Sequence, residues 1–300
     1  MANAVPMAKR TAIVTGARGQ LGTDLVRVLA GMGWQVYGPG REELDFTDPD
    51  AVEREFARIR PDAVIHAGAY TAVDAAEEDY GGAFLVNAFG TRNIALEAER
   101  YGAKLVYVST DYVFDGTGSE PYGEYDRTSP GNVYGESKLA GEKFALRLSS
   151  RTFVVRTSWV YGLGGGNFVK TMLKLAETRD TISVVNDQIG SPTYTVDLAV
   201  CIARLLETER YGIYHAAGGG QCSWYEFAQA IFRRAGLNVW LKPVTTAEFP
   251  RPARRPAYSV LGQAELAEAG LPPMRGWEDA LDAFFQEREH ALAPRYSKLG

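Results

Sequence analysis

Short, continuously apolar runs alternate with longer amphipathic stretches in the first half of the chain. The runs at 11–15, 34–37, 61–66 and 104–108 are rich in β-branched and apolar residues, and each leads into a polar or glycine-containing segment. Runs of this length and character are typical of buried parallel strands. Helical periodicity lies between them, first in the stretch that ends near Leu29. The alternation predicts an α/β fold with a doubly wound, Rossmann-type parallel sheet.

The second half continues this pattern less regularly. Strands are expected at 152–156 and 211–216, and helices up to about Thr178, over 224–234 with Ser223 as N-cap, and over 277–289. We therefore expect a disordered extension at 1–10 and a Rossmann domain at 11–160, to which later elements around 195–235 return. A smaller α/β substrate-binding region would comprise mainly 161–194 and 236–290.

A glycine-rich turn follows the first expected strand and opens the first helix. It reads Gly16-Ala17-Arg18-Gly19-Gln20-Leu21-Gly22. In such a turn Gly16 permits the tight bend, Gly19 lets the backbone approach a pyrophosphate, and Gly22 allows close helix–strand packing. The helix N-terminus then offers free N–H groups to the phosphates. The spacing is G-x-x-G-x-x-G rather than G-x-G-x-x-G, so a purely structural turn is the alternative.

The segment after the second strand bears on the choice of cofactor. An NAD-selective site usually places an acidic residue there to bind the ribose 2′-hydroxyl, and this chain has no acid before Glu42. Arg41 suits a 2′-phosphate, so we expect NADPH as the cofactor, and NADH is an alternative that the site would also accept. For Arg41 itself, the alternative to phosphate binding is a solvated arginine on a loop. Asp48 is expected to cap the next helix ahead of Pro49, and Asp45 is a candidate to reach the adenine.

Small and polar residues follow the third and fourth strands. Gly68, Ala69 and Tyr70 come after the third, where small residues let a cofactor lie against the strand end, and His66 before them is expected to be structural. The fourth strand leads into Ser109, Thr110 and Asp111. Because ligands bind at the carboxyl ends of strands in doubly wound sheets, Thr110 is expected either to bond a substrate carbonyl or to cap the strand end.

Tyr134 and Lys138 are the strongest catalytic candidates. Four residues apart on a helix, they share one face, and an ammonium beside a phenol lowers the pKa of the phenol. Tyr134 would then serve as a proton donor near neutral pH. The Y-x-x-x-K spacing is weak alone, and its place about 110 residues after the glycine turn strengthens it.

Together these motifs resemble the extended short-chain dehydrogenases/reductases. More narrowly, the stretches GQLG, AYTAVDAAE, STDYVFDG, NVYGESKLAGE, RTSWVYG, NDQIGSPT and PARRP resemble the dTDP-4-dehydrorhamnose reductase family, from about Arg10 to Phe285. The resemblance implies NADPH-dependent reduction of the 4-keto group of dTDP-4-dehydro-L-rhamnose to dTDP-L-rhamnose, with Tyr134 as proton donor. It implies the catalytic residues Thr110, Tyr134 and Lys138, and the substrate-binding residues Thr110, Asp111, Trp159, Asn167 and Gln188. In the Pro- and Arg-rich stretch 245–256, Arg254 or Arg255 is expected to bind the diphosphate, with a solvated basic loop as the alternative. The expected cofactor-binding residues are Gly16, Gly19, Gln20, Leu21, Gly22, Arg41, Asp45, Phe46, Gly68, Ala69, Tyr70, Asn87, Tyr134 and Lys138.

The composition of the chain excludes several classes of protein. A net charge of −5 argues against generic nucleic-acid binding, and no apolar run approaches the length of a membrane span. Cys201 and Cys222 form neither a disulfide framework nor a zinc set, which favours a cytoplasmic protein. We assign no metal-ligand cluster, so magnesium and a homodimer both stay open.

Two other functions remain open at this stage. An epimerase or dehydratase shares the fold and the Tyr/Lys pair, but Asp111-Tyr112 after Thr110 does not fit the acidic pair that dehydratases carry there. A non-catalytic, nucleotide-sugar-binding regulatory subunit also shares the fold. That alternative predicts that catalytic residues have been replaced, but Thr110, Tyr134 and Lys138 are all present.

Overall fold

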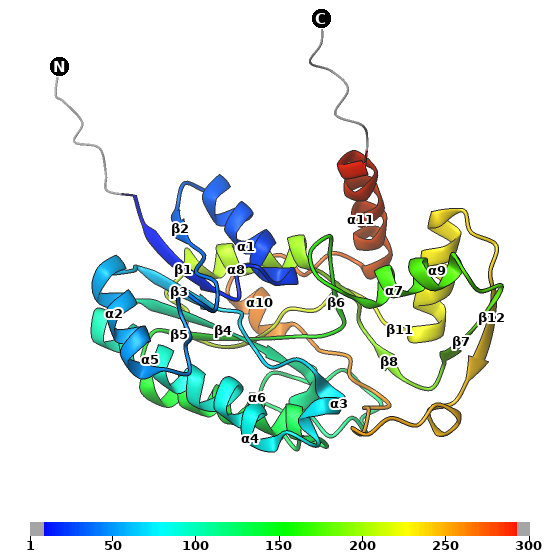
Figure 1. Ribbon diagram of the computed structural model, residues 1–300, viewed down its shortest axis with the longest axis horizontal. Coiled ribbons are helices and arrows are strands. Elements are labelled where there is room, and N and C mark those ends of the chain that lie inside the picture. The colour runs from blue at the N-terminus through cyan, green and yellow to red at the C-terminus, as the bar shows by residue number, and fades with distance from the viewer. Residues whose placement is uncertain (1–8, 293–300) are drawn as a thin grey trace, which may run out of the picture.

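The computed structural model describes residues 9–292, and its core is a parallel sheet flanked by helices (Figure 1). The sheet order is β2-β1-β3-β4-β5-β10, with every neighbouring pair parallel. These strands are β1 (Thr11–Thr15), β2 (Gln35–Tyr37), β3 (Ala63–His66), β4 (Lys104–Thr110), β5 (Thr152–Thr157) and β10 (Gly212–His215). The predicted doubly wound parallel sheet is therefore confirmed.

Alternate strand residues enter different cores, which explains the continuous apolar runs in the sequence. In β1, Ala12 and Val14 join the core beneath α1 (Gln20–Gly31) and α8 (Thr195–Leu206), whereas Ile13 faces the opposite core. That second core is covered by α2 (Pro49–Ile59), α5 (Gly90–Tyr101) and α6 (Val133–Leu148). Figure 1 shows α1 and α8 on one face of the sheet and α5 and α6 on the other. A strand buried on both faces has no polar side to alternate with.

The order of the strands creates a topological switch point beside β1. The chain leaves β1 for β2 on one side and then returns to form β3 on the other. Connections that diverge in this way leave a crevice outside the carboxyl ends of the two central strands, and ligands of doubly wound sheets bind there. The glycine turn follows β1 at this point, and the segment 67–71 follows β3.

A second, smaller body packs beside the sheet around an aromatic core. It contains α7 (Phe168–Ala176), β7 (Thr181–Val185), α9 (Trp224–Ala235), β12 (Trp240–Val244) and α11 (Trp277–Leu292). Phe227 and Phe284 are fully buried in this core, against Tyr161. Short strand pairs connect the body to the sheet: β6 (Val160–Tyr161) with β9 (Thr193–Tyr194), and β8 (Ile189–Gly190) with β11 (Cys222–Ser223).

Helix boundaries follow the capping signals in the sequence. The Asp48 side chain accepts from the Asp50 N–H at the start of α2, with Pro49 as first residue, as predicted. Ser223 and Glu226 form a reciprocal capping box on α9, so the expected N-cap is confirmed. Shorter helices are α3 (Val73–Ala76), α4 (Tyr80–Phe84) and α10 (Ala264–Glu268).

The domain boundaries differ from the prediction in three places. Residues 195–215 do return to the sheet, but α9 packs in the core of the second body, because its apolar stripe meets α7 and α11. Conversely Leu266 and Met274, expected in the substrate region, pack against the core of the sheet. Of the extension expected to be disordered, residues 1–8 lie outside the described chain. Arg10 is ordered, and its guanidinium donates to Glu207 at 2.8 Å.

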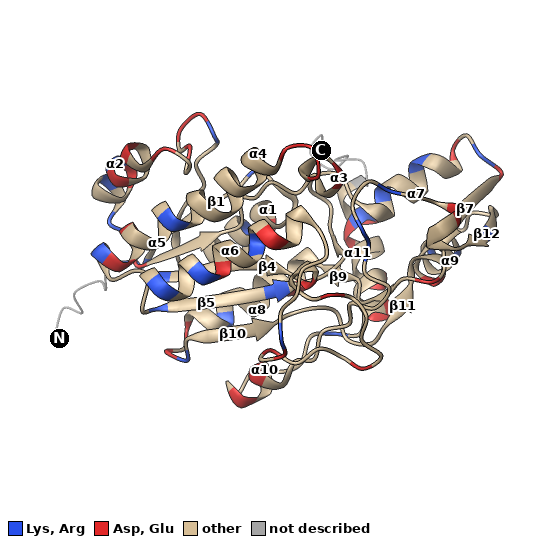
Figure 2. Cartoon of the chain, turned by 90° about the horizontal axis from the view of Figure 1, so that it is seen from below, with Lys and Arg blue, Asp and Glu red and all other residues tan. Residues whose placement is uncertain are grey.

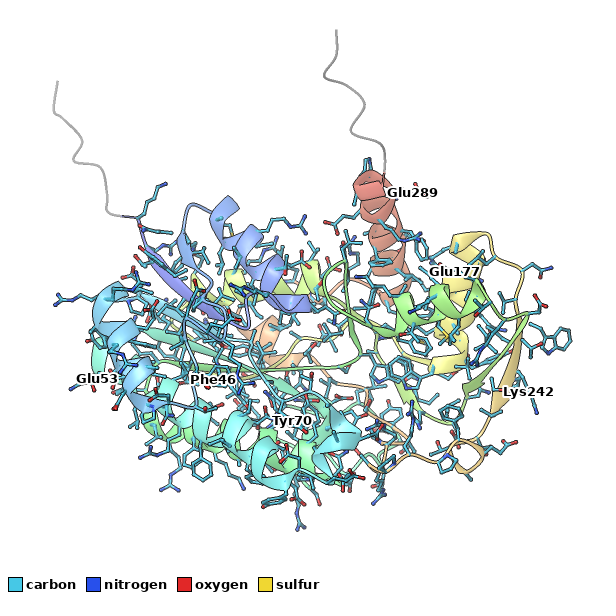
Figure 3. All side chains as sticks on the ribbon, in the orientation of Figure 1. Phe46, Glu53, Tyr70, Glu177, Lys242 and Glu289 are labelled. Carbon is cyan, nitrogen blue, oxygen red and sulfur yellow. The ribbon has the colours of Figure 1, made fainter. Side chains whose placement is uncertain are left out.

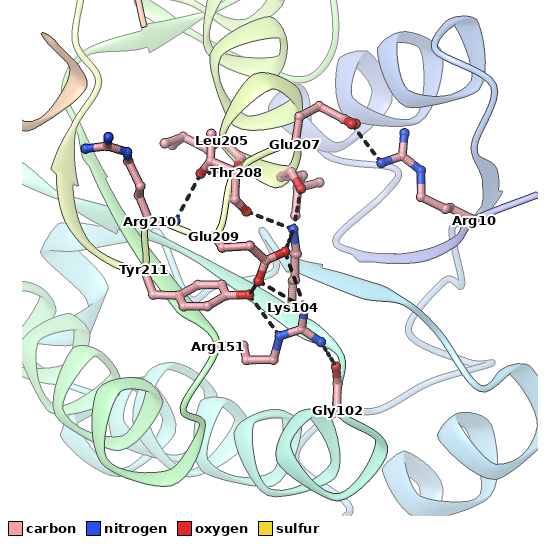
Figure 4. Close-up of polar contacts among 11 residues, drawn as sticks. Arg10, Gly102, Lys104, Arg151, Leu205, Glu207, Thr208, Glu209, Arg210 and Tyr211 are labelled. Carbon is pink, nitrogen blue, oxygen red and sulfur yellow. Dashed lines mark hydrogen bonds and ion pairs between the residues drawn. The ribbon is translucent and has the colours of Figure 1, made fainter. Parts of the chain in front are cut away.

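A polar network ties together the starts of three neighbouring strands, at the edge of the sheet opposite the crevice (Figure 4). The Lys104 ammonium at the start of β4 lies 2.7 Å from Glu209, which also pairs with Arg151 before β5 at 3.2 Å. Arg151 Nε donates to the Tyr211 hydroxyl before β10 at 2.8 Å. The hydrogen bonds from Lys104 and Tyr211 lower the pKa of Glu209 to about 2, so this carboxylate is ionised at neutral pH.

Charges of both signs cover the outer faces of the helices. Figure 2 shows Lys, Arg, Asp and Glu interspersed on the face formed by α5 and α6, without a basic stripe in this view. Between residues 9 and 292 no helix is both long and apolar enough to cross a membrane. Figure 3 shows side chains filling the space between the sheet and its helices, and it labels Phe46 and Tyr70, which are half-buried on the loops that follow β2 and β3.

Candidate active site

The glycine turn has the geometry that a dinucleotide requires. Gly16 has φ +67°, and a Cβ there would lie 2.7 Å from the Gly68 nitrogen. A Cβ on Gly22 would lie 2.1 Å from the Gly16 carbonyl oxygen, so α1 can approach the turn only without a side chain. Gly19 is the N-cap of α1, and no side chain caps this helix. Its first N–H groups are therefore free for an anion, and these residues fit the pyrophosphate of a dinucleotide.

Gln20 and Asn167 join the turn to the second body. The Asn167 amide donates to Gln20 Oε1 at 2.7 Å and to the Gly162 carbonyl at 2.8 Å, and its Oδ1 caps α7. Gln20 in turn donates to the Val160 carbonyl at 3.0 Å. Asn167 was expected to bind substrate, but its side chain is engaged at the edge of the cofactor turn. Leu21 packs partly buried against the sheet core.

Two arginines, rather than the expected one, lie at the segment after β2: Arg41 within it and Arg18 from the glycine turn. Arg41 is 85% exposed, and its guanidinium lies 3.8 Å from Asp45. The Arg18 guanidinium covers Gly40, where a Cβ would lie 2.6 Å from Arg18 Cζ. Its charge is compensated only by exposed Glu42, at 3.4 Å, and Glu43, at 3.9 Å. Both cations therefore lie where a ribose 2′-phosphate would be read.

Asp45 and Phe46 are occupied within the protein. Asp45 Oδ1 accepts from the backbone and hydroxyl of Thr47, and the hydroxyl bond lowers the pKa of Asp45. The Phe46 ring packs edge-on against His66, with ring centroids 4.8 Å apart, and fills the space beside Gly68. Asp45 is thus engaged within its own turn, and its expected contact with the adenine stays a prediction.

His66 is structural, as expected. Its Nδ1 lies 2.7 Å from the Thr15 hydroxyl, and Thr15 also accepts from the Gly68 N–H at 3.2 Å. Burial lowers the pKa of His66 to about 3, with a smaller contribution from Lys138, so the imidazole is neutral. The ring pins β3 to β1 at the crevice and is not free to exchange protons near neutral pH.

Asn87 fixes the loop after β3 to α6. It lies in a single π-helical turn, Leu85–Phe89, between α4 and α5. Its Oδ1 accepts from the Tyr70 N–H at 2.8 Å, and its Nδ2 donates to the Ser137 hydroxyl at 2.9 Å. π-helical turns are frequent at functional sites. The side chain is fully used in these bonds, so its contribution to cofactor binding would be to shape the loop at 67–71.

Tyr134 and Thr110 meet at the carboxyl end of β4. Asn132 caps α6, which holds Tyr134 in the first turn of the helix. Burial raises the pKa of Tyr134, and the hydrogen bond with Thr110 opposes this only in part. The prediction of a lowered pKa is therefore wrong for this arrangement, and the phenol is protonated at neutral pH.

Lys138 explains the difference. Its ammonium donates to the Val108 carbonyl at 2.7 Å and lies 4.2 Å from the centre of the Tyr107 ring. It thus points along β4 rather than at the Tyr134 hydroxyl. Burial lowers the pKa of Lys138 to about 7, and the charge of Glu142 counteracts this shift. The two residues share one helical face as predicted, but the ammonium is not the group that acts on the phenol.

Asp111 lies buried beside this pair. Its Oδ1 accepts from the Thr110 hydroxyl at 3.0 Å, whereas Oδ2 has no hydrogen-bond partner within the described chain. Burial raises the pKa of Asp111 to about 6, against hydrogen bonds from Ser259 and Thr110. An unpaired carboxylate oxygen at a strand end is a ready acceptor for a sugar hydroxyl.

Trp159 and Gln188 belong to the wall that the second body presents. Trp159 has φ +46°, a left-handed conformation that is unusual for a bulky residue and typical of functional sites. Its ring stacks on Trp224 with centroids 3.5 Å apart, and Gly190 leaves room for it. Gln188 is buried and donates to the Thr246 hydroxyl at 3.0 Å. Both side chains are therefore fixed by neighbours of the second body.

Arg255, rather than Arg254, faces the site. Arg254 is exposed, and its backbone carbonyl accepts from Asn132 at 2.9 Å. The Arg255 guanidinium pairs with Asp74 at 2.9 Å and lies over Tyr112, whose ring meets that of Tyr134 edge-on. Its Nη1 is buried with no partner in the described chain, as expected of a donor awaiting an anionic oxygen.

The structure adds residues that the sequence reasoning did not single out. Asp74 holds both Arg255 and, at 3.6 Å, Arg251, while Glu77 accepts from the Val133 N–H at the start of α6. Asp74, Glu77 and Arg18 all lie inside motifs that the sequence already marked. Two signals in the sequence could have identified them. Arg18 is a basic residue within the glycine turn, and Asp74 and Glu77 are acids that precede the helix expected to carry Tyr134. Among residues 9–292 no group of three His, Cys, Asp or Glu side chains could hold a metal ion.

Comparisons with known proteins agree with this geometry. The family described as RmlD substrate binding domain matches residues 10–290. The spore coat polysaccharide biosynthesis protein SpsK of Bacillus subtilis is 46% identical over 93% of this chain and 98% of its own. A dTDP-4-dehydrorhamnose reductase of Streptomyces griseus is 44% identical over 91% and 92%. The crystal structure of dTDP-4-dehydrorhamnose reductase from Bacillus anthracis, in complex with NADP, is 47% identical with a TM-score of 0.92, over 93% of this chain and all of that one.

Proposed function

The chain belongs to the RmlD substrate binding domain family, and from this premise we propose that it reduces the 4-keto group of dTDP-4-dehydro-L-rhamnose to dTDP-L-rhamnose with NADPH. The observation that carries the proposal is the meeting of Tyr134 and Thr110 at the carboxyl end of β4, beside the crevice of the glycine turn. Relatives named dTDP-4-dehydrorhamnose reductase, and one with bound NADP, support the substrate and the cofactor.

The turn and its neighbours would hold the cofactor. Gly16, Gly19 and Gly22 admit the pyrophosphate at the N-terminus of α1, and Arg18 and Arg41 face the 2′-phosphate. When bound, NADPH supplies a hydride to the carbonyl carbon. The small residues of 67–69 leave the end of β3 open beside the crevice.

The residues at the end of β4 would complete the reduction. The protonated Tyr134 hydroxyl donates its proton to the carbonyl oxygen as negative charge develops there. Thr110 orients that oxygen, and Lys138 offsets the charge of the phenolate that remains. Asp111 accepts from a sugar hydroxyl, Trp159 borders the sugar, and Arg255 binds the diphosphate. Gln188 supports the wall of this pocket.

The test is an assay of the purified protein with NADPH and the 4-keto sugar nucleotide. We expect absorbance at 340 nm to fall in proportion to the ketone added, with one NADPH consumed per product. A cofactor that co-purifies and is never consumed would instead favour an epimerase. Stoichiometric capture of an enzyme partner without turnover would favour a regulatory subunit. We also infer a cytoplasmic location, which the two buried, free cysteines support.

Arg18 is expected to select the phosphorylated cofactor. Its charge is exposed and only partly compensated, so a contact with a 2′-phosphate is worth about 1–1.5 kcal/mol, roughly a tenfold change in affinity. We therefore expect Arg18→Ala to raise the Kd for NADPH about tenfold and to leave the Kd for NADH unchanged. Isothermal titration with each cofactor measures both values.

Arg41→Ala is the matched comparison, because Arg41 lies in the segment after β2 that the Arg18 guanidinium reaches at Gly40, and it is more exposed. We expect a smaller loss of NADPH affinity in this variant. Equal losses for NADPH and NADH in Arg18→Ala would contradict a phosphate contact, since that contact is absent with NADH.

A further inference from the structure

A buried ion pair lies directly behind the proposed catalytic residues. Glu142 on α6 and Arg156 on β5 are each 2% exposed. Arg156 Nε donates to Glu142 Oε1 and Nη2 donates to Oε2, both at 2.8 Å. Two parallel hydrogen bonds of this kind fix both side chains in one geometry.

The remaining polar atoms of the pair are also satisfied. The Ser109 hydroxyl donates to Glu142 Oε1 at 2.6 Å, and Arg156 Nη1 donates to the Glu124 carbonyl at 2.9 Å. His215 Nε2 lies 3.3 Å from Arg156 Nη1, while its Nδ1 faces the carbonyls of Tyr122 and Gly262. The imidazole therefore carries its proton on Nδ1 and accepts on Nε2. Burial lowers the pKa of His215 to about 3, so it stays neutral.

Glu142 and Lys138 attach α6 to consecutive residues of β4. The two side chains are one helical turn apart and point to the same side of α6. Lys138 bonds the Val108 carbonyl, and Glu142 bonds the Ser109 hydroxyl. The next residue of β4 is Thr110, which meets Tyr134. The register of α6 on β4 therefore sets the approach of the phenol to the strand end.

A buried ion pair is weak evidence of a purely stabilising role. Its desolvation offsets most of its attraction, and apolar residues of similar volume often stabilise a core as well or better. Glu142 also acts on a charge outside the pair, because it is the charged side chain that opposes the effect of burial on the pKa of Lys138. The pair therefore calls for an explanation beyond folding.

We propose that Glu142 is a positioning residue for the reduction: its carboxylate anchors α6 to β4 at Ser109 and places a negative charge one helical turn from Lys138. Arg156 and Ser109 hold its carboxylate in place. This inference rests on the proposed function for its catalytic meaning. The electrostatic part concerns residues of this chain alone and can be measured without turnover.

Of the ionisable groups around Lys138, Asp111 at the strand end changes charge in the relevant range, because burial raises its pKa to about 6. His66 faces Lys138 from β3, Tyr107 from β4 and Tyr134 from its own helix, with Arg156 beyond Glu142 on β5. The pKa of His66 is about 3, and burial raises the pKa values of Tyr107 and Tyr134 above their ordinary range. The difference in Lys138 midpoint between each variant and the wild type therefore reports on Glu142 and Arg156, because Asp111 is present in all of these proteins.

The experiment measures the pH midpoint of Lys138 by NMR in full-length protein that carries ¹³Cε-labelled lysine. The Lys138 signal is assigned as the one that is missing from the spectrum of Lys138→Met. Glu142→Gln removes a negative charge and leaves Arg156 unpaired, so we expect the midpoint of Lys138 to fall by about one pH unit. Arg156→Gln removes a positive charge, so we expect a smaller shift upward. Opposite shifts from the two partners are not expected of a merely structural pair. An unchanged midpoint in folded Glu142→Gln would overturn the proposal.

Activity then tests the positioning role. In Glu142→Gln the alkaline limb of the kcat profile should move to lower pH with the Lys138 midpoint, so that turnover at pH 8 falls to about a tenth of wild-type turnover at the same pH, while the two agree at pH 5. Glu142→Asp keeps the charge on a shorter side chain. We expect its limb to stay at the wild-type pH while kcat falls several-fold, with the KM for NADPH unchanged.

Two outcomes separate the possible failures. If a single variant does not fold, the double variant Glu142→Met/Arg156→Met removes both charges and keeps the volume, and its Lys138 midpoint should still lie below that of the wild type. A wild-type midpoint in this double variant would refute the proposal. Wild-type protein that consumes no NADPH would refute the proposed function instead, whatever the NMR titrations give.

Discussion

Tyr134→Phe is expected to lower kcat at least a hundredfold while the affinity for NADPH stays within a factor of two. The variant removes only the hydroxyl that Thr110 bonds, and the ring keeps its packing against Tyr112. A positioned proton donor commonly contributes a factor of about 10²–10⁴ to rate. Steady-state turnover at 340 nm gives kcat, and quenching of protein fluorescence gives the cofactor Kd.

Tyr112→Phe is the matched control for this variant. Its ring lies 5.6 Å from that of Tyr134, and burial raises the pKa of Tyr112 to about 12, so its hydroxyl is also protonated. That hydroxyl faces Arg255 rather than Thr110. We expect kcat within about threefold of wild type and the larger change in the KM for the sugar nucleotide. Near-normal kcat in Tyr134→Phe would refute the assigned donor.

Tyr134 is protonated before the reaction begins, and this makes it the acid of the reduction. Because burial raises the pKa of the phenol, it enters the reaction as an acid across the physiological range. The phenolate left after proton transfer is unfavourable in the same buried site, and the ammonium of Lys138 is the nearby charge that lowers this penalty. Lysine therefore matters most after the proton has moved, which explains why it need not contact the phenol beforehand.

The sequence predicted the strand–turn–helix unit well because its constraints are local. A glycine with positive φ, an uncapped helix start and a close helix–strand contact all depend on residues within one short segment. The caps of two other helices, Asp48 and Ser223, were predicted on the same local grounds. Such features can be recognised before any tertiary contact is known.

What the sequence missed depends on partners far away in the chain. The direction of Lys138 is set by a carbonyl of β4, 30 residues earlier. The choice between Arg254 and Arg255 depends on which one the loop turns toward Asp74, about 180 residues earlier, and Asn167 is held by Gln20 in the cofactor turn. Spacing identifies the type of residue at such positions. The path of the backbone decides which of two neighbouring residues, such as Arg254 and Arg255, points its side chain into the site.

Gly22→Ala is expected to weaken NADPH binding at least tenfold. The added methyl would lie 2.1 Å from the Gly16 carbonyl oxygen and 2.7 Å from Ala17 Cα, and both are backbone atoms that cannot turn aside. The turn must therefore open or α1 must move, and either change misplaces the N–H groups that would meet the pyrophosphate. Titration calorimetry gives the Kd, and thermal unfolding with and without NADPH gives the stabilisation by the ligand.

Gly31→Ala is the control on the same helix. Gly31 is the last residue of α1 and exposed, and a Cβ there would meet no atom within 4 Å. Alanine in place of glycine at an unhindered helical position stabilises by roughly 0.5–1 kcal/mol, so the melting temperature should rise slightly and the Kd should not change. If Gly22→Ala bound NADPH as tightly as Gly31→Ala, the cofactor could not lie on this turn. The fit of the helix N-terminus to a pyrophosphate would then have to be abandoned.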